Sequence, residues 1–267
     1  MSKMLEAGVG KLNYYVEGST GHLVFDNPSK FNAVTYDMWC ALPGALDALV
    51  ANPAVRVIVL SGAGDRAFIS GADIAQFGQE REGSTSHRFN EATELGYAAV
   101  LDCVKPTIAK VRGICMGGGL GIALNCDIRI CASDAKFRMP AGWLGLGYAF
   151  DGVKRFTEII GVSNTADLFY SARIFDADEA LRMGLVKQVL PASDLDEFVQ
   201  NFAVMVSENA PLTLAAVKRA LIELRKNPDS RNKELINSTV QDCFDSEDYY
   251  EGRRAFAEKR KPIFKNR

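Results

Sequence analysis

Residues 106–127 read Pro-Thr-Ile-Ala-Lys-Val-Arg-Gly-Ile-Cys-Met-Gly-Gly-Gly-Leu-Gly-Ile-Ala-Leu-Asn-Cys-Asp, and this stretch decides the fold. Its first part, Pro106 to Val111, is apolar and β-branched, which predicts a buried strand. Glycines at 117, 118, 119 and 121 follow, and the apolar residues after them predict a helix. A strand, a glycine turn and a helix in this order are typical of an α/β protein.

The glycine turn has the composition of a backbone site for an anion. Consecutive glycines let backbone N–H groups approach a ligand closely, and a helix N-terminus adds free N–H donors. No Gly-Lys-Ser/Thr follows, which excludes a P-loop, and G-x-G-x-x-G is missing from the first βα unit, which disfavours a dinucleotide fold. A packing role explains the glycines equally well.

The rest of the chain supports an α/β fold with a helical end. An N-terminal hairpin is followed by alternating strands and helices, while the stretch after about Ser193 has few strand candidates. We therefore expect a core over residues 1–192 and a helical subdomain over residues 193–267. The predicted strands are 12–16, 22–25, 55–60, 106–111 and 128–131; the predicted helices are 35–50, 91–103, 195–206, 211–224, 233–243 and 247–259, with a polar loop over 76–90.

Composition excludes several classes of function. The chain has 267 residues, with 31 basic and 33 acidic side chains, and this balance argues against a nucleic-acid partner. Two histidines and six cysteines without a C-x-x-C pair argue against a metal site and favour buried, reduced thiols. The longest uncharged stretch, Gly113 to Cys126, is too short and glycine-rich to cross a membrane, and no secretory signal is visible. We expect a cytoplasmic protein.

A second glycine turn points to a reaction type. Residues 67–74, Ala-Phe-Ile-Ser-Gly-Ala-Asp-Ile, follow the strand at 55–60 after a short loop. Two such turns can each direct one N–H at a single carbonyl oxygen, which is what an oxyanion hole requires.

With these segments the chain resembles the crotonase, or enoyl-CoA hydratase/isomerase, superfamily. The resemblance extends over essentially the whole chain, and the segments that carry it occur in the family's order. They are Asn27-Pro-Ser-Lys-Phe-Asn-Ala33, Phe68 to Ile74, Lys105 to Ala109, Gly113 to Asp127, Ala180-Leu-Arg-Met-Gly-Leu-Val186 and Asp245 to Phe264.

The resemblance implies a crotonase-type spiral of ββα units with a helical C-terminal trimerisation subdomain, and a homotrimer or a dimer of trimers. It implies an acyl-CoA thioester as the ligand, so coenzyme A is part of the substrate and no separate cofactor is expected. The backbone N–H groups of Ala72 and Gly118 would form the oxyanion hole. The CoA-binding residues would be Lys30, Ala72, Asp73 and Ile74, with Phe256 and Lys259 reaching the CoA of a neighbouring subunit.

The chain departs from the family where its hydratases carry two glutamates. Those positions hold Gly121 and Ala141, which can neither accept nor deliver a proton. The resemblance implies that Asp151 takes a glycine position of the family that borders the reacting carbons, where a carboxylate could remove or return a proton at the α- or γ-carbon. The alternative is that Asp151 is the N-cap of a helix over 152–160.

Tyr148 adds a partial resemblance to methylmalonyl-CoA decarboxylase, a family member with a tyrosine at the matching place. Its hydroxyl would orient a carboxylate or protonate an enolate, or else its ring packs at the pocket rim. That relative keeps a carboxylate where this chain has Gly121. His87 is a further candidate in the polar loop, although a lone histidine there is commonly solvated.

Together these features predict an acyl-CoA enzyme that stabilises a thioester enolate. Isomerisation, decarboxylation or another enolate reaction fits better than glutamate-dependent hydration. Thioester hydrolysis and a non-catalytic acyl-CoA-binding module remain the alternatives.

Overall fold

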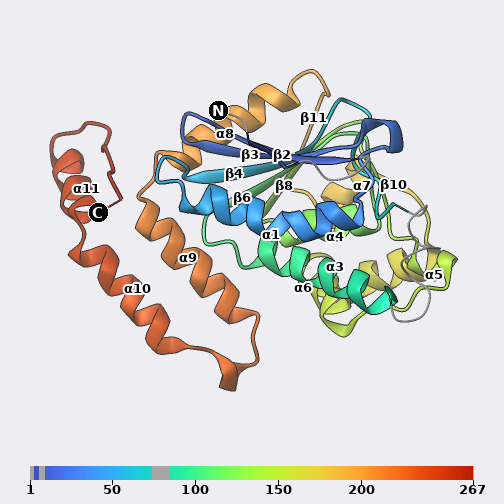
Figure 1. Cartoon of the computed structure of the whole chain (residues 1–267). Helices are drawn as coiled ribbons and strands as arrows, with labels where there is room; N and C mark the ends of the chain where they lie inside the picture. Colours follow the sequence, from blue (N-terminus) through green and yellow to red (C-terminus); the bar gives the residue numbers. More distant parts are fainter. Residues whose placement is uncertain (1–2, 6–9, 74–84, 267) are drawn as a thin grey trace.

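Two sheets with helices around them form the body of the protein (Figure 1). The computed structural model describes residues 3–5, 10–73 and 85–266. The large sheet has seven strands in the order β1-β2-β3-β4-β6-β8-β11. Their bounds are β1 Lys3–Leu5, β2 Lys11–Glu17, β3 Thr20–Asp26, β4 Val57–Gly62, β6 Thr107–Val111, β8 Ile128–Ala132 and β11 Gln188–Leu190.

The large sheet is antiparallel at its start and parallel afterwards. Strands β1, β2 and β3 pair antiparallel, which confirms the predicted hairpin, and the pairs β3–β4, β4–β6, β6–β8 and β8–β11 are parallel. The predicted strands at 55–60, 106–111 and 128–131 are confirmed as β4, β6 and β8.

The small sheet has the order β10-β9-β7-β5 and supplies the second strand of each repeat. Its strands are β5 Ala67–Ile69, β7 Ile114–Met116, β9 Lys136–Arg138 and β10 Phe175–Asp176. Along the chain β4 and β5, β6 and β7, and β8 and β9 alternate between the two sheets, with helices after each pair. The expected spiral of ββα units is therefore confirmed.

The helices differ in how they meet the sheets (Figure 1). Helices α1, α3 and α4 lie on one face of the large sheet, and α8 lies on the other. Their bounds are α1 Tyr36–Ala51, α3 Thr85–Leu101, α4 Gly118–Asn125, α5 Ala141–Leu144, α6 Phe150–Ser171, α7 Ala177–Arg182, α8 Leu195–Ser207, α9 Pro211–Leu224, α10 Lys233–Asp245 and α11 Glu247–Ala257, with short 3₁₀ turns η1 Pro28–Lys30 and η3 Pro228–Ser230.

Strand β4 shows why the large sheet is buried on both faces. Successive side chains of a strand point to opposite faces, so an apolar run serves two cores. Ile58 and Leu60 belong to the main core under α1, α3 and α4, whereas Val57 and Val59 pack in a second core with α8.

Helix α3 begins earlier than the predicted residue 91. It starts at Thr85, because buried Phe89 continues the apolar spacing of Ala92 and Val100 by one turn upstream. This corrects the polar loop expected over 76–90 for the part from 85 onward, and residues 76–84 lie outside the described residues.

The expectation of six buried thiols is also corrected. All six cysteines are free and four are buried, but Cys40 is exposed on α1 and Cys243 is half-buried on α10.

Helices α9, α10 and α11 form a C-terminal arm that extends away from the sheets (Figure 1). Helix α8, by contrast, packs its Leu195, Val199 and Ala203 against the large sheet. The domain boundary at residues 192 and 193 stays a prediction.

None of the helices in the described ranges is long and apolar enough to span a membrane. In the same ranges, no three His, Cys, Asp or Glu side chains are grouped as metal ligands.

Candidate active site

The first glycine turn follows β5 and is held by the chain before α1. The Val34 N–H donates to the Gly71 carbonyl at 2.8 Å, and the Asp73 N–H donates to the Val34 carbonyl at 3.0 Å. Gly71 has a φ of 123°, which favours glycine, and Ala72 faces Val34 in a parallel bridge. Because the two residues on either side of Ala72 make these bonds, the N–H of Ala72 itself points away from Val34.

The second glycine turn joins β7 to α4. Gly117 has a φ of 50°, and its N–H donates to the Arg138 carbonyl at 3.0 Å. Helix α4 begins at Gly118, so the N–H of Gly118 has no acceptor inside the helix. The first helical bond runs from the Gly121 N–H to the Gly117 carbonyl at 3.1 Å.

The two turns lie against each other. A Cβ atom on Gly118 would stand 3.6 Å from the backbone nitrogen of Ala72, and one on Gly71 would stand 3.8 Å from the nitrogen of Gly118. Among the described residues, no hydrogen bond uses either of these N–H groups as a donor. The structure therefore brings together the two backbone donors that the sequence singled out, at the N-terminus of a buried helix.

Tyr97, which the sequence analysis missed, fills the space beside Gly121. Its hydroxyl donates to the Gly118 carbonyl at 3.3 Å, and its ring meets Trp39 edge-on with centroids 5.1 Å apart. A Cβ atom on Gly121 would stand 2.6 Å from that hydroxyl oxygen. A buried helical glycine signals that a neighbour occupies its place, but the sequence does not say which neighbour.

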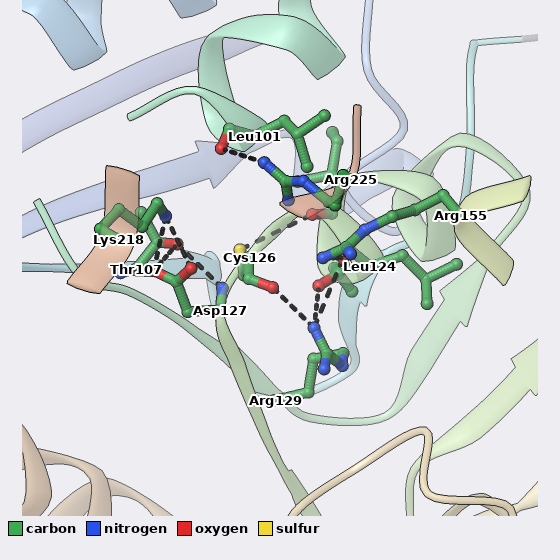
Figure 2. A network of polar contacts seen from close by, with 11 residues as sticks. Leu101, Thr107, Leu124, Cys126, Asp127, Arg129, Arg155, Lys218 and Arg225 are labelled. Carbon is green, nitrogen blue, oxygen red and sulfur yellow. Dashed lines mark hydrogen bonds and ion pairs between the residues drawn. The ribbon is translucent and has the colours of Figure 1, made fainter. Parts of the chain in front are cut away.

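Two arginines bind the other end of α4 (Figure 2). The Arg129 guanidinium donates to the carbonyls of Ala123 at 3.2 Å and Cys126 at 2.7 Å, and Arg155 donates twice to the Leu124 carbonyl at 3.0 and 2.8 Å. Burial lowers the pKa of Arg129 to about 10, so it stays charged at neutral pH. These cations satisfy the carbonyl end of the helix whose N–H end forms the candidate site.

A buried ion pair continues this network into the C-terminal arm (Figure 2). The Lys218 ammonium on α9 donates to both carboxylate oxygens of Asp127, at 2.7 and 2.6 Å. Asp127 also accepts from the N–H and the hydroxyl of Thr107, at 2.8 and 3.0 Å. Asp127, two residues after the end of α4, thus anchors α9.

Asp151 lies in the first turn of α6 and is exposed. The alternative that it is the N-cap is wrong, because the helix begins at Phe150 and its N-cap is Ala149, with no side-chain cap bond. Within the described ranges, no hydrogen bond or ion pair involves its carboxylate. Its catalytic role stays a prediction.

Tyr148 lies just before α6 in a group of aromatic rings. It meets Phe169 edge-on with centroids 4.9 Å apart, and Phe156 with centroids 6.1 Å apart. A Cβ atom on Gly152 would stand 2.5 Å from its ring, so the glycine permits this close approach. Burial raises the pKa of Tyr148 to about 12, which keeps its hydroxyl protonated at neutral pH. His87 is exposed on α3.

The residues expected to bind CoA fall in two separate places. Lys30 and Asp73 form an ion pair of 2.6 Å beside the first glycine turn, with Asp73 only 6% exposed in its side chain. Ile74 lies outside the described residues. Phe256, which is 88% exposed, and Lys259 lie at the end of the C-terminal arm, across the molecule from α5 (Figure 1).

Comparison with known proteins gives a consistent result over the whole chain. Residues 16–267 match the family model described as enoyl-CoA hydratase/isomerase. A crotonyl-CoA hydratase of Syntrophomonas wolfei is 33% identical over 242 residues, covering 91% of this chain and 93% of that protein. A peroxisomal Δ(3,5)-Δ(2,4)-dienoyl-CoA isomerase of Arabidopsis thaliana is 32% identical, covering 93% of both.

Solved structures agree with this result. The structure of an enoyl-CoA hydratase/carnithine racemase from Magnetospirillum magneticum superposes with a TM-score of 0.89 at 30% identity, covering 98% of this chain and 97% of the other.

Proposed function

Because the chain belongs to the enoyl-CoA hydratase/isomerase family, we propose that it binds an acyl-CoA thioester and stabilises its enolate. The thioester oxygen accepts hydrogen bonds from the N–H groups of Ala72 and Gly118. The observation that carries this proposal is the approach of the two turns, with the Ala72 nitrogen 3.6 Å from the Cβ position of Gly118. Backbone donors fixed before the reaction stabilise developing charge without reorganisation.

The helix behind Gly118 adds to this stabilisation. The N-terminus of a helix carries partial positive charge, and α4 directs it at the place where the oxyanion forms. Arg129 and Arg155 hold the opposite end of α4, so the donor is fixed from both sides.

The reaction is an enolate reaction other than glutamate-dependent hydration, such as isomerisation or decarboxylation. Two small residues, Gly121 and Ala141, stand where a hydratase of this family needs carboxylates. The space at Gly121 is taken by Tyr97. Asp151 is the proposed proton carrier, and Tyr148 is a proposed donor because its raised pKa keeps the proton in place.

Coenzyme A lies along Lys30, Ala72, Asp73 and Ile74 in this proposal. Phe256 and Lys259 contact the CoA held by a neighbouring copy in a homotrimer or a dimer of trimers. Support comes from the exposure of Phe256 and from the place of its helix, α11, on the opposite side of the molecule from α5 (Figure 1).

The test is a panel of enoyl-, malonyl- and aryl-CoA esters, with products followed by mass spectrometry. A rearranged or decarboxylated ester with its thioester intact is the expected result. Free CoA as the only product would instead indicate a thioester hydrolase. Binding without any product would indicate a binding module.

Two variants test the proposed roles of Gly118 and Asp151. Gly118→Ala places a methyl group at the thioester position with contacts no closer than 3.3 Å, so it should fold and lose turnover. Asp151→Asn should abolish turnover while CoA-ester binding survives. Unchanged turnover in Asp151→Asn would remove Asp151 from the mechanism, and unchanged turnover in Gly118→Ala would remove the oxyanion hole.

A further inference from the structure

Three groups converge on one point beside Gly118. A Cβ atom there would stand 3.3 Å from Cζ2 of Trp39, 3.5 Å from the hydroxyl oxygen of Tyr97 and 3.6 Å from the nitrogen of Ala72. Glycine leaves this point unfilled. An atom of a ligand bound at Ala72 and Gly118 therefore has Tyr97 and Trp39 as its next neighbours.

The indole N–H of Trp39 is a buried donor without an acceptor in the described part of the chain. The residue is 1% exposed, and its Nε1 has no hydrogen-bond partner among the described residues. An unmet buried donor destabilises the folded state, so native proteins rarely keep one without a ligand or a water. Nε1 lies two bonds from Cζ2, the Trp39 atom nearest to the Cβ position of Gly118, because both atoms are bonded to Cε2.

Tyr97 brings a hydroxyl whose bond to its own backbone neighbour is long. The 3.3 Å separation from the Gly118 carbonyl exceeds the usual length of about 2.7–2.8 Å for an O–H to oxygen bond. The ring is held edge-on against Trp39 and above Gly121, so the hydroxyl stays near the point beside Gly118. An acceptor atom bound beside Gly118 is therefore within reach of this hydroxyl.

The hydrogen-bonding groups of Tyr97 and Trp39 indicate which kind of ligand atom they can bind. Indole N–H is a donor only, and the tyrosine hydroxyl can donate as well. Both groups are uncharged, so they favour a neutral carbonyl oxygen over a carboxylate, whose charge would be costly to bury without a cation. In a thioester held through its carbonyl oxygen, the atoms that reach past the α-carbon begin at carbon 3.

Resting on the function proposed above, we propose that Tyr97 and Trp39 together bind a keto oxygen on carbon 3 of the acyl group. The substrate class is then a 3-oxoacyl-CoA thioester. Tyr97 is a specificity-determining residue in this arrangement, and it occupies the place where Gly121 carries no side chain.

The experiment compares acetoacetyl-CoA with butyryl-CoA, which have the same chain length and differ in the oxygen at carbon 3. Affinities are measured by calorimetry, and mass spectrometry checks that each ester stays intact; where one is turned over, kcat/KM replaces the affinity. The unchanged protein should prefer acetoacetyl-CoA by about tenfold or more, the gain from one to two added hydrogen bonds.

Tyr97→Phe keeps the ring and removes the hydroxyl. The preference should fall about tenfold, with the affinity for butyryl-CoA unchanged. Tyr170→Phe, which removes an exposed hydroxyl on α6, is the matched control and should keep the preference. A Tyr97→Phe variant that weakens both esters equally would overturn the assignment.

A measurement on Trp39 itself does not depend on the folding of the Tyr97 variant. The chain has two tryptophans, so Trp143→Phe leaves Trp39 as the sole indole fluorophore. Acetoacetyl-CoA should shift its emission to longer wavelength through the new hydrogen bond, and butyryl-CoA should not.

The two proposals fail in different ways. If the unchanged protein binds both esters with equal affinity, the role of Tyr97 and Trp39 is wrong and the CoA-thioester site stands. If neither ester binds, the proposed function and this inference are both wrong.

Discussion

The side chain of Tyr97 occupies the volume that a side chain at position 121 would need, and this is the clearest single-residue feature of the site. The Cβ position of Gly121 lies 2.6 Å from the Tyr97 hydroxyl and 2.8 Å from two ring carbons. No side chain larger than hydrogen fits at residue 121 unless Tyr97 moves. A glutamate at 121 would therefore require Tyr97 to move.

A double-mutant cycle measures the energetic coupling between positions 121 and 97. Gly121→Ala should be destabilised by overpacking of about 1–3 kcal/mol, which the gain of about 1 kcal/mol in helix propensity partly offsets. In a Tyr97→Leu background the overpacking disappears while the propensity gain stays. We therefore expect a coupling energy of about 1–3 kcal/mol in urea denaturation.

Gly44→Ala supplies the reference for propensity alone, because Gly44 lies inside α1 with nothing within 4 Å of its Cβ position. It should be neutral or stabilising. Additive effects at 121 and 97 would contradict the shared volume.

His22 gives a pH dependence at the residue scale. Burial lowers the pKa of His22 below its usual value of 6.5, although Glu17 nearby raises it in part. The unfolded chain then binds the proton more tightly than the folded chain. The contribution of His22 to the free energy of unfolding is fully present above pH 6.5. It falls as the pH drops from 6.5 toward the lowered pKa.

Denaturation midpoints measured from pH 7.5 to pH 5.5 check this expectation. His22→Phe keeps the stacking on Tyr15, whose centroid lies 4.6 Å away, and should flatten the fall. His87→Gln removes the other histidine and should leave the fall in place. A His22→Phe protein with the original slope would show that another group is responsible.

At the scale of elements, α9 is fastened to the body by a buried charge. The Lys218 side chain is only 4% exposed, and its ammonium binds both oxygens of Asp127. Asp127 in turn follows α4, so the arm and the candidate site share an anchor (Figure 2). Removing one partner leaves a partly buried charge without compensation, which is more costly than never having the pair.

Lys218→Met should therefore lower the free energy of unfolding by about 3 kcal/mol, and the amides of α9 should exchange hydrogen faster. Lys226→Met, on the residue pair Lys226–Glu223 at the end of the same helix, is the control. That lysine is 46% exposed, and its loss should cost at most about 1 kcal/mol. Equal effects of the two variants would contradict the anchoring role of Lys218.

The elements also show what the sequence can and cannot predict. Strands β4, β6 and β8 are short, mostly apolar runs, and α4 follows a glycine turn, so the local pattern is sufficient to predict them. The start of α3 depends on whether Phe89 belongs to the apolar face, and the burial that decides this comes from packing against other helices, such as the ring contact with Tyr36 on α1.

The candidate site likewise has a part that the sequence predicts and a part that only the packed structure shows. The turns at Ala72 and Gly118 carry their own glycines, so their roles as backbone donors were open to prediction. Tyr97 and Trp39 come from α3 and α1, and only the packing of these helices on α4 brings them to Gly118. The N-cap alternative for Asp151 failed by two residues, because Ala149 is the N-cap and the helix begins at Phe150.

For the whole molecule, the C-terminal arm leaves apolar side chains uncovered. On α9 the exposed residues Val217, Leu221 and Leu224 follow helical spacing, and α10 exposes Val240 and Phe244. An exposed apolar stripe of this kind is typical of a surface that binds another protein. The proposed trimer would cover it.

Light scattering after gel filtration should give the mass of three or six chains. Leu221→Lys places a charge in the stripe and should shift the protein to smaller species. Val204→Lys changes an exposed apolar residue on α8 and should leave the mass unchanged. A monomeric mass for the unchanged protein would contradict the trimer.

The pairing of β11 with β8 has a consequence for synthesis on the ribosome. The strands are parallel neighbours, yet β8 ends at Ala132 and β11 ends at Leu190. Until Leu190 is made, β8 presents an open row of backbone donors and acceptors to any other nascent strand. At about 5–20 residues per second this interval lasts roughly 3–12 s. The time at which the growing chain is most open to misassembly is thus set by how late its last sheet strand is encoded.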